Sequence, residues 1–178
     1  MTGLAKEYGN GLYELAREDD LIAQLHDELC EIGELIEAEP DFARLLSSRA
    51  IERGERLRVV DEAFAGRAHP YIVNYMKLMV EKERFEAFAD SIKWFHQRYN
   101  EEFGIVEAEV TTAVPLSQAD FDQLSAKLRE MSGKNVSLNC HVDPALIGGV
   151  RVEMEGRRYD NTIQSKLGRL RQSLAKGL

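Results

Sequence analysis

The chain has 178 residues and a net charge of −8, and hydrophobic residues account for 44% of it. A chain of this size and composition folds into one large domain or two small ones, which excludes a disordered tail. The longest stretch without Asp, Glu, Lys or Arg is Val110–Ala119, ten residues, whereas a membrane-spanning helix needs about 20. No basic segment followed by an apolar one stands at the N-terminus, so we expect no secretory signal and a cytoplasmic location.

The first hundred residues carry apolar side chains at the three- and four-residue spacing of amphipathic helices. The stripes lie at residues 4–15, 22–36, 42–46, 57–64, 71–79 and 85–99. Pro40 ends the second stripe, because proline lacks an amide hydrogen and restricts the residue before it. Pro70 suits the first turn of the fifth helix. Six short helices joined by tight loops imply a compact bundle.

The pattern changes after the sixth stripe. Residues 105–114 are β-branched and partly alternating, which favours a strand. A helix beginning at the capping box 117–120, strands at 136–142 and 150–154 and an amphipathic closing helix at 163–174 are predicted after it. The predicted fold class is therefore mainly α, with an N-terminal six-helix bundle at residues 1–104 and a small C-terminal α/β domain at residues 105–178.

Acidic residues are concentrated in the first of these two parts. Residues 1–104 hold 22 acidic and 13 basic side chains, whereas residues 105–178 hold 9 and 10. Between Glu7 and Asp41 there are twelve acids and a single base, Arg17. A nucleic-acid-binding protein needs a basic face for the phosphates, so we exclude nucleic acid as a partner. The uneven charge also indicates two separate physical units.

Candidate catalytic and metal-ligating residues are few. His26 and Cys30 are four apart on a predicted helix and could face one metal ion, but two ligands do not make a site. His96 is interpreted as a core or solvated histidine. Cys140 and His141 are neighbours on a strand and point to opposite faces, which excludes a nucleophile–base pair. We therefore predict no catalytic residue, no metal site and no cofactor, and interpret the chain as an interaction protein.

Three regions of the chain resemble one known family. The segment 136–155 contains Asp143, Pro144, Leu146, Ile147, Gly148 and Gly149 between two predicted strands. It is similar to the signature of the delta subunit of the F-type ATP synthase, whose mitochondrial relative is the oligomycin-sensitivity-conferral protein. The opening residues 5–16 and the closing helix 163–174 resemble the same family, so the likeness covers nearly the whole chain.

The resemblance implies a non-catalytic stator subunit of a proton-translocating ATP synthase. In this family the N-terminal helical domain binds the N-terminal helices of the alpha subunits on the catalytic hexamer, and the C-terminal domain binds the b subunits of the peripheral stalk. The stator keeps the hexamer from turning with the rotor. We accordingly expect the chain at the cytoplasmic face of the cell membrane, associated with it only indirectly, through the complex.

The resemblance also indicates where partners bind. In the family a groove between the first and fifth helices receives the partner helix. The corresponding residues here are Tyr8, Gly11, Leu12, Leu15, Tyr75, Leu78 and Met79. The Gly148-Gly149 pair is expected to shape the backbone of a turn and not to contact a ligand. A free-standing cytoplasmic adaptor that binds some other amphipathic helix fits composition and periodicity equally well.

Two glycines depart from the family pattern, which usually has alanine at the positions of Gly9 and Gly11. Each glycine in a helix interior costs about 1 kcal/mol relative to alanine. One interpretation is a frayed first helix. The other is that the missing methyl groups let a partner helix approach closely.

Overall fold

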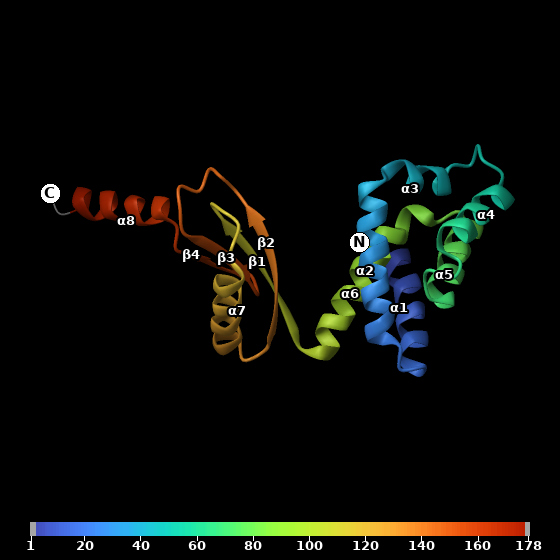
Figure 1. The fold of residues 1–178 in the computed structure, drawn as a ribbon, viewed down its shortest axis with the longest axis horizontal. Helices are drawn as coiled ribbons and strands as arrows, with labels where there is room; N and C mark the ends of the chain where they lie inside the picture. Colours follow the sequence, from blue (N-terminus) through green and yellow to red (C-terminus); the bar gives the residue numbers. More distant parts are fainter. Residues whose placement is uncertain (1–2, 177–178) are drawn as a thin grey trace. The chain divides into compact units, whose positions relative to one another are not determined.

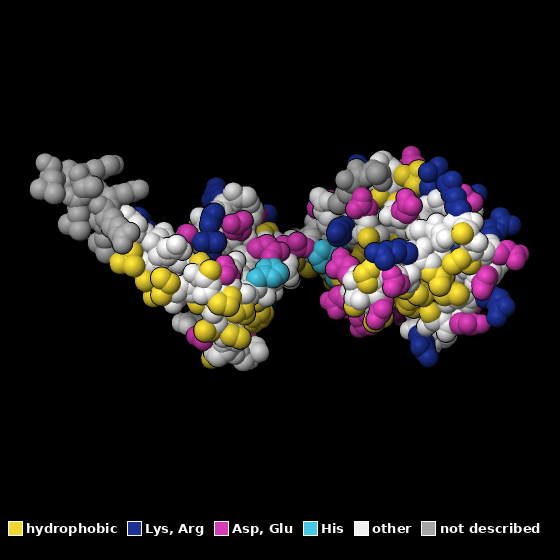
Figure 2. Space-filling view, turned by 90° about the horizontal axis from the view of Figure 1, so that it is seen from above, with side chains coloured by type: hydrophobic (Ala, Val, Ile, Leu, Met, Phe, Trp, Pro, Cys, Tyr) yellow, Lys and Arg dark blue, Asp and Glu magenta, His cyan; other side chains and the backbone are white. Residues whose placement is uncertain are grey.

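The computed structural model describes residues 3–176, and their side chains up to residue 169. The described chain is mainly helical, as the sequence predicts, and its small sheet has four strands where the sequence predicts three (Figure 1). It divides into two compact units, Met1–Glu101 and Glu102–Leu178. None of the described helices combines the length and the apolar character needed to cross a membrane. In the space-filling view, hydrophobic side chains gather in patches among acidic and basic ones (Figure 2).

The first unit is built from helices alone. Its elements are α1 (Gly3–Glu18), α2 (Ile22–Ala38), α3 (Pro40–Ser47), α4 (Arg53–Phe64), α5 (Pro70–Glu81), the 3₁₀ turn η1 (Phe85–Ala87) and α6 (Phe88–Phe103). The last two residues of α6 already belong to the second unit. Pro70 opens α5 as predicted, and His69 before it accepts a hydrogen bond from the Tyr71 amide at 3.2 Å. Pro40 separates two helices but belongs to the second, because it stands at the first position of α3.

The core of this unit is aromatic and aliphatic. Tyr13, Phe88, Phe95 and Met76 are among its fully buried side chains, and the rings of Tyr13 and Phe95 meet edge to face at 5.0 Å. Arg56 is also buried, and its guanidinium donates to the carbonyl of Leu46 at 3.1 Å, which ties α4 to the end of α3. The amphipathic stripes therefore converge on one interior.

The second unit contains the sheet. Its elements are β1 (Ile105–Thr112), α7 (Gln118–Ser132), β2 (Asn135–Val142), β3 (Val150–Met154), β4 (Arg157–Asp160) and α8 (Ile163–Lys176). The strand order is β2-β1-β3-β4; β1 pairs with β2 in parallel, and the other pairs are antiparallel. A parallel pair needs a crossover, which α7 supplies.

Side chains from β1, α7, β2 and β3 form a separate small core in this unit. Its buried members are Ala108, Val110, Leu128, Val136, Val152 and Met154. Ser117 accepts a hydrogen bond from the Asp120 amide at 3.2 Å at the start of α7, and Gly133, with φ of 68°, ends the helix. The side chains of Leu170 and Leu174, which the apolar pattern of α8 includes, lie outside those that the structure describes.

Candidate functional site

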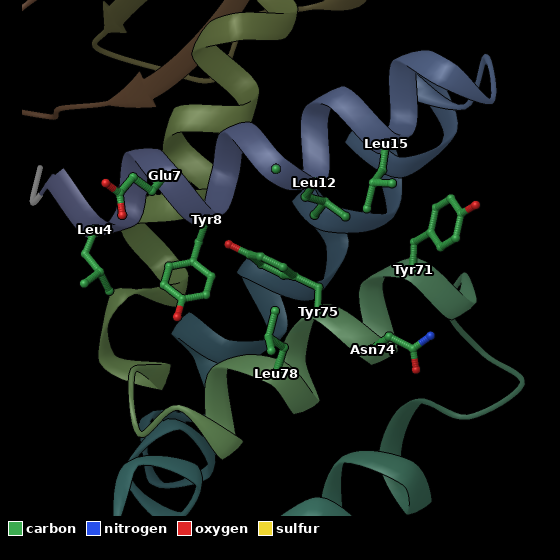
Figure 3. Close-up of a pocket in the computed structure, with 10 residues that line it drawn as sticks. Leu4, Glu7, Tyr8, Leu12, Leu15, Tyr71, Asn74, Tyr75 and Leu78 are labelled. Atoms are coloured by element: carbon green, nitrogen blue, oxygen red, sulfur yellow. The ribbon is translucent and has the colours of Figure 1, made fainter.

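An open groove of about 610 Å³ lies between α1 and α5 on the helical unit. Its walls are formed by Leu4, Glu7, Tyr8, Gly11, Leu12, Leu15, Tyr71, Asn74, Tyr75 and Leu78. The side chains of the two helices face each other across this space (Figure 3). Most of the lining is apolar, so the groove offers a hydrophobic surface to whatever enters it.

The groove exists because α1 carries two apolar faces. Ala5, Tyr13 and Ala16 are fully buried and face the core, whereas Leu15, on the groove side, is 48% exposed. Leu78 on α5 is 40% exposed in the same way. Two large leucines that are exposed to solvent at the rim of one groove indicate an interaction surface.

Tyr75 forms part of the groove floor and carries a buried polar atom. Its side chain is 7% exposed, and its hydroxyl is buried with no hydrogen-bond partner of good geometry among the described residues. Ser91, which lies nearby, donates instead to the Phe88 carbonyl at 2.6 Å. Burial raises the pKa of Tyr75 to about 12, against a smaller lowering effect of the Ser91 hydroxyl. The Tyr75 side chain is therefore neutral, and its hydroxyl lies beneath the surface of the groove.

The rim of the groove is acidic. The Tyr71 hydroxyl donates to the carboxylate of Asp19 in the turn after α1, which fixes one end of the groove. This hydrogen bond to an anion raises the pKa of Tyr71. Glu7 stands among the lining residues near the other end. These charges favour a partner that carries basic residues beside its apolar face.

Six of the seven residues predicted for the groove line it, and one does not. Met79 is fully buried, because it stands one position beyond Leu78 on α5 and the helical turn directs it into the core. Sequence reasoning missed four lining residues, Leu4, Glu7, Tyr71 and Asn74. Extending the helical period by one turn, from Tyr8 to Leu4 and from Tyr75 to Tyr71, finds two of them.

Comparison with known proteins decides the family. The model of the family described as "ATP synthase delta (OSCP) subunit" matches residues 4–174. The chain belongs to this family. Among its relatives is the ATP synthase subunit delta of Alkaliphilus oremlandii, 32% identical over 97% of this chain and 96% of the relative. The subunit delta of Desulfitobacterium hafniense is 33% identical over 97% of this chain and 96% of the relative. The subunit delta of Fuscovulum blasticum is 33% identical over 97% of this chain and 93% of the relative.

The fold agrees with this assignment. A chain in the cryo-EM structure of the Toxoplasma gondii mitochondrial ATP synthase hexamer superposes with a TM-score of 0.71 at 18% identity, covering 98% of both chains. As a member of the delta (OSCP) family, the chain is a non-catalytic component of the peripheral stalk of ATP synthase. Its partners are therefore other subunits of that complex.

Gly9 and Gly11 occupy opposite sides of α1. Gly11 lines the groove, and a β-carbon built there would meet nothing within 4 Å. Gly9 is buried, and a β-carbon there would lie 3.0 Å from the Ser91 carbonyl oxygen and 3.1 Å from Trp94 Cε3. Close approach is therefore the reason for glycine at position 9, but the helix that approaches is α6 of the same chain.

The Asp143–Gly149 segment, which carries the family signature, is a shaped turn before β3. Gly149 has φ of +91°, and a β-carbon there would lie 2.5 Å from the Asn161 carbonyl oxygen. The Ile163 amide donates to the Gly148 carbonyl at 3.0 Å. Asp143 holds the other end, where its carboxylate accepts from the Ala145 amide at 3.0 Å. The turn thus seats the beginning of α8 against the beginning of β3.

The remaining signature residues present both buried and exposed surfaces. Leu146 is 3% exposed and anchors the turn, Pro144 is exposed, and Ile147 is 73% exposed. Ile147, Gly148 and Gly149 also line a second open cavity, of about 600 Å³, within the α/β unit. Three exposed apolar side chains line it: Val114, Ile147 and Ile163. The Asp143–Gly149 turn therefore borders an apolar surface, in addition to shaping the backbone before β3.

The candidate metal ligands of the sequence gain a third member in the fold. His26 and Cys30 on α2 lie beside His96 on α6, and the donor atoms of the three lie within 4.8 Å of one another. No spacing rule finds His96, because it joins the pair through tertiary packing. Cys140 and His141 follow each other on β2: His141 Nε2 lies 2.8 Å from a Glu109 carboxylate oxygen, and Cys140 is an exposed free thiol.

Proposed function

We propose that this chain joins the catalytic headpiece of ATP synthase to its peripheral stalk through two separate docking surfaces. Residues 1–104 bind the N-terminal helices of the alpha subunits in the α1/α5 groove, and residues 105–178 bind the b subunits. The observation that carries the proposal is the open apolar groove, lined from both helices and rimmed by exposed leucines.

The groove suits a single amphipathic helix. Such a helix lays apolar residues at i, i+3, i+4 and i+7 into a hydrophobic groove, which matches the spacing of Tyr8, Leu12 and Leu15 along α1. The bare backbone at Gly11 permits close approach of a partner. The acidic Glu7 and Asp19 favour basic residues beside the apolar face of that partner.

The α/β unit offers a surface of different character. Its apolar cavity is bordered by two bases, Lys127 and Lys166, and one acid, Asp120, so a partner that pairs apolar residues with acidic ones is favoured there by the excess of positive charge. We assign this surface to the b subunits of the stalk. The opposite charge preferences of the two surfaces reduce binding of each partner at the wrong one.

Two attachments resist torque better than one. When one surface is bound, the second binding event becomes intramolecular, so modest separate affinities combine into a slowly dissociating joint. The chain needs no bond chemistry for this role. It is held at the cytoplasmic face of the cell membrane through the complex, where the stator lets proton flow drive ATP synthesis.

The proposal is tested by filling the groove without disturbing the fold. Gly11→Leu places a side chain into open space, and leucine favours a helix over glycine. The variant should remain folded and bind a synthetic alpha N-terminal peptide at least tenfold more weakly than the parent chain, as measured by calorimetry. Gly54→Leu on α4, outside the groove, is the matched control and should bind as the parent does. Equal binding by the Gly11 variant contradicts the proposal.

A free-standing adaptor is the competing function, and one observation separates the two. A stator subunit sediments with membranes and leaves them together with the ATPase headpiece at low ionic strength. An adaptor stays in the supernatant throughout.

A further inference from the structure

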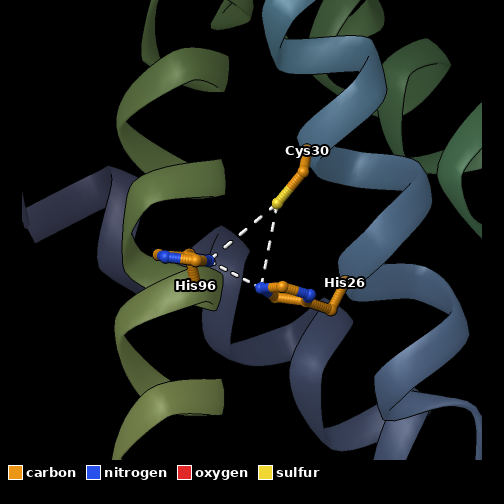
Figure 4. A group of neighbouring side chains, drawn as sticks. All are labelled: His26, Cys30 and His96. Atoms are coloured by element: carbon orange, nitrogen blue, oxygen red, sulfur yellow. Dashed lines mark hydrogen bonds between the residues drawn. The ribbon is translucent and has the colours of Figure 1, made fainter. Parts of the chain in front are cut away.

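A cluster of three side chains outside the docking surfaces links α2 to α6. His26 and Cys30 stand one turn apart on α2, and His96 projects from α6 toward both (Figure 4). His26 Nε2 lies 2.6 Å from His96 Nδ1, and Cys30 Sγ lies 3.8 Å from the first nitrogen and 3.9 Å from the second. The three donor atoms form a small triangle.

The size of this triangle matches the ligand sphere of a tetrahedral zinc ion. With Zn–N of about 2.0–2.1 Å and Zn–S of about 2.3 Å, tetrahedral ligands are about 3.3 Å apart for two nitrogens and about 3.5 Å for nitrogen and sulfur. Both sulfur distances are within a few tenths of an ångström of that value. The two histidine nitrogens need to separate by about 0.7 Å, which a small rotation of the His96 ring provides.

The surroundings hold at least one of these ligands in a binding orientation. Asp27 Oδ1 lies 3.0 Å from His26 Nδ1, so the carboxylate can accept a hydrogen bond from the protonated Nδ1. This tautomer leaves Nε2 as the electron-pair donor. A carboxylate behind a histidine is the usual outer partner of a metal-bound imidazole. The Tyr99 ring stacks on the His26 ring with centroids 3.9 Å apart and planes 15° from parallel. The stacking on Tyr99 and the hydrogen bond to Asp27 thus both hold the His26 ring in place.

The donor set selects the kind of ion. Two imidazoles and a thiolate suit zinc and similar transition metals, whereas magnesium and calcium prefer oxygen ligands. Three protein ligands leave the fourth position of a tetrahedral ion to water. Cys30 and His96 are partly buried, so the cluster is reachable from solvent on their side.

We propose that His26, Cys30 and His96 bind one zinc ion, which cross-links α2 and α6. Binding releases the thiol proton of Cys30, and the proton between the two imidazoles moves to Nε2 of His96, which leaves His96 Nδ1 as an electron-pair donor. Because an unfolded chain does not bring α2 and α6 together, the bound ion stabilises the folded helical unit. The site is independent of the groove and of the proposed stator function.

The test is a titration of the full-length, reduced and chelator-treated chain with Zn²⁺, and in parallel with Co²⁺ as a spectroscopic substitute. One equivalent should bind per chain, and the cobalt form should show the intense visible bands of a tetrahedral ion and a thiolate-to-cobalt charge-transfer band. Zinc should raise the Tm of the helical unit. Cys30→Ser should abolish the charge-transfer band, and His96→Gln should weaken binding at least a hundredfold.

Matched controls are present in the same chain. Cys140→Ser and His141→Gln alter the other cysteine and an exposed histidine and should leave the titration unchanged. Asp27→Asn keeps all three ligands and should weaken binding by about tenfold to a hundredfold. This variant is at an exposed position, so it remains informative if Cys30→Ser fails to fold.

Two results overturn the proposal. One is the absence of stoichiometric zinc binding to the parent chain at micromolar concentration. The other is binding that survives both Cys30→Ser and His96→Gln, because the ion then sits elsewhere. In the first case the short contact between the histidines is a hydrogen bond through a shared proton and nothing more.

Discussion

Gly9 of α1 lies so close to Trp94 of α6 that a β-carbon at residue 9 would be 3.1 Å from Cε3 of the indole ring. Two residues along the same helix, Gly11 faces open space. One helix therefore uses a glycine to pack against its own domain and another to keep a groove clear.

This contrast predicts opposite effects on stability. Gly9→Leu forces a side chain against Trp94 and the Ser91 carbonyl and should lower the free energy of unfolding by about 1–3 kcal/mol. Gly11→Ala should raise it by about 0.5–1 kcal/mol, because alanine loses less backbone entropy in a helix. Urea unfolding followed by the fluorescence of the single tryptophan measures both. A stable Gly9→Leu variant contradicts the close packing of α1 on α6.

The signature turn gives a second matched pair. At Gly149 the φ of +91° and the Asn161 carbonyl both oppose a side chain, so Gly149→Ala should cost about 1–3 kcal/mol or more. A β-carbon at Gly148 meets only the tip of Ile163, at 2.8 Å, which can rotate away. Gly148→Ala should therefore be clearly milder. Thermal unfolding followed by circular dichroism compares the two, and equal losses of Tm argue against the stated role of Gly149.

Exposed groove leucines should matter for binding more than for folding. Leu15→Ser and Leu78→Ser each remove a half-exposed side chain, so the loss of stability should be small. Covering each leucine contributes about 1 kcal/mol, so the double variant should bind the alpha N-terminal peptide about tenfold to thirtyfold more weakly. Leu35→Ser on α2, 58% exposed and outside the groove, is the control and should bind normally.

The contacts between Asp160 and Thr162 at the start of α8 should weaken at low pH. The Thr162 hydroxyl and amide donate to the Asp160 carboxylate at 2.7 and 3.1 Å and lower the pKa of that carboxyl. A pKa depressed by folding stabilises the folded chain above the unfolded value of about 3.9 and loses this contribution as the pH falls through the folded value. Carboxyl ¹³C NMR should therefore show Asp160 titrating below about 3.9.

The hydrogen bonds with Thr162 are the largest cause of this shift, ahead of the charges of Arg151 and Arg158. Thr162→Val should accordingly raise the midpoint of Asp160 toward its ordinary value, whereas Arg158→Gln should move it less. A larger shift of the Asp160 midpoint in Arg158→Gln than in Thr162→Val would contradict this explanation.

Periodicity predicts much of the fold because each stripe has to be buried. The six stripes of the first part correspond to helices whose apolar side chains enter one core, and Ser117 begins α7 as its capping pattern requires. The strand β4 was missed because Arg157–Asp160 contains no alternating apolar residues. It forms through pairing with β3 across the turn at Gly156, which local pattern does not reveal.

The groove was only partly predictable for a related reason. Sequence spacing identifies the apolar residues of α1 and α5, but it does not say which ones face the core, and Met79 and Leu78 differ by a single position. The contact of His96 with His26 and Cys30 depends on how α6 packs on α2. Neither feature is encoded in a local stretch of sequence.

The most direct test of the central claim is proton pumping driven by ATP in membranes from which this chain has been removed. The full chain should restore pumping, whereas residues 1–104 and 105–178 added together as separate pieces should each bind their own partner and restore little. Pumping restored equally by the two separate pieces would show that no continuous link between headpiece and stalk is needed, which contradicts the account.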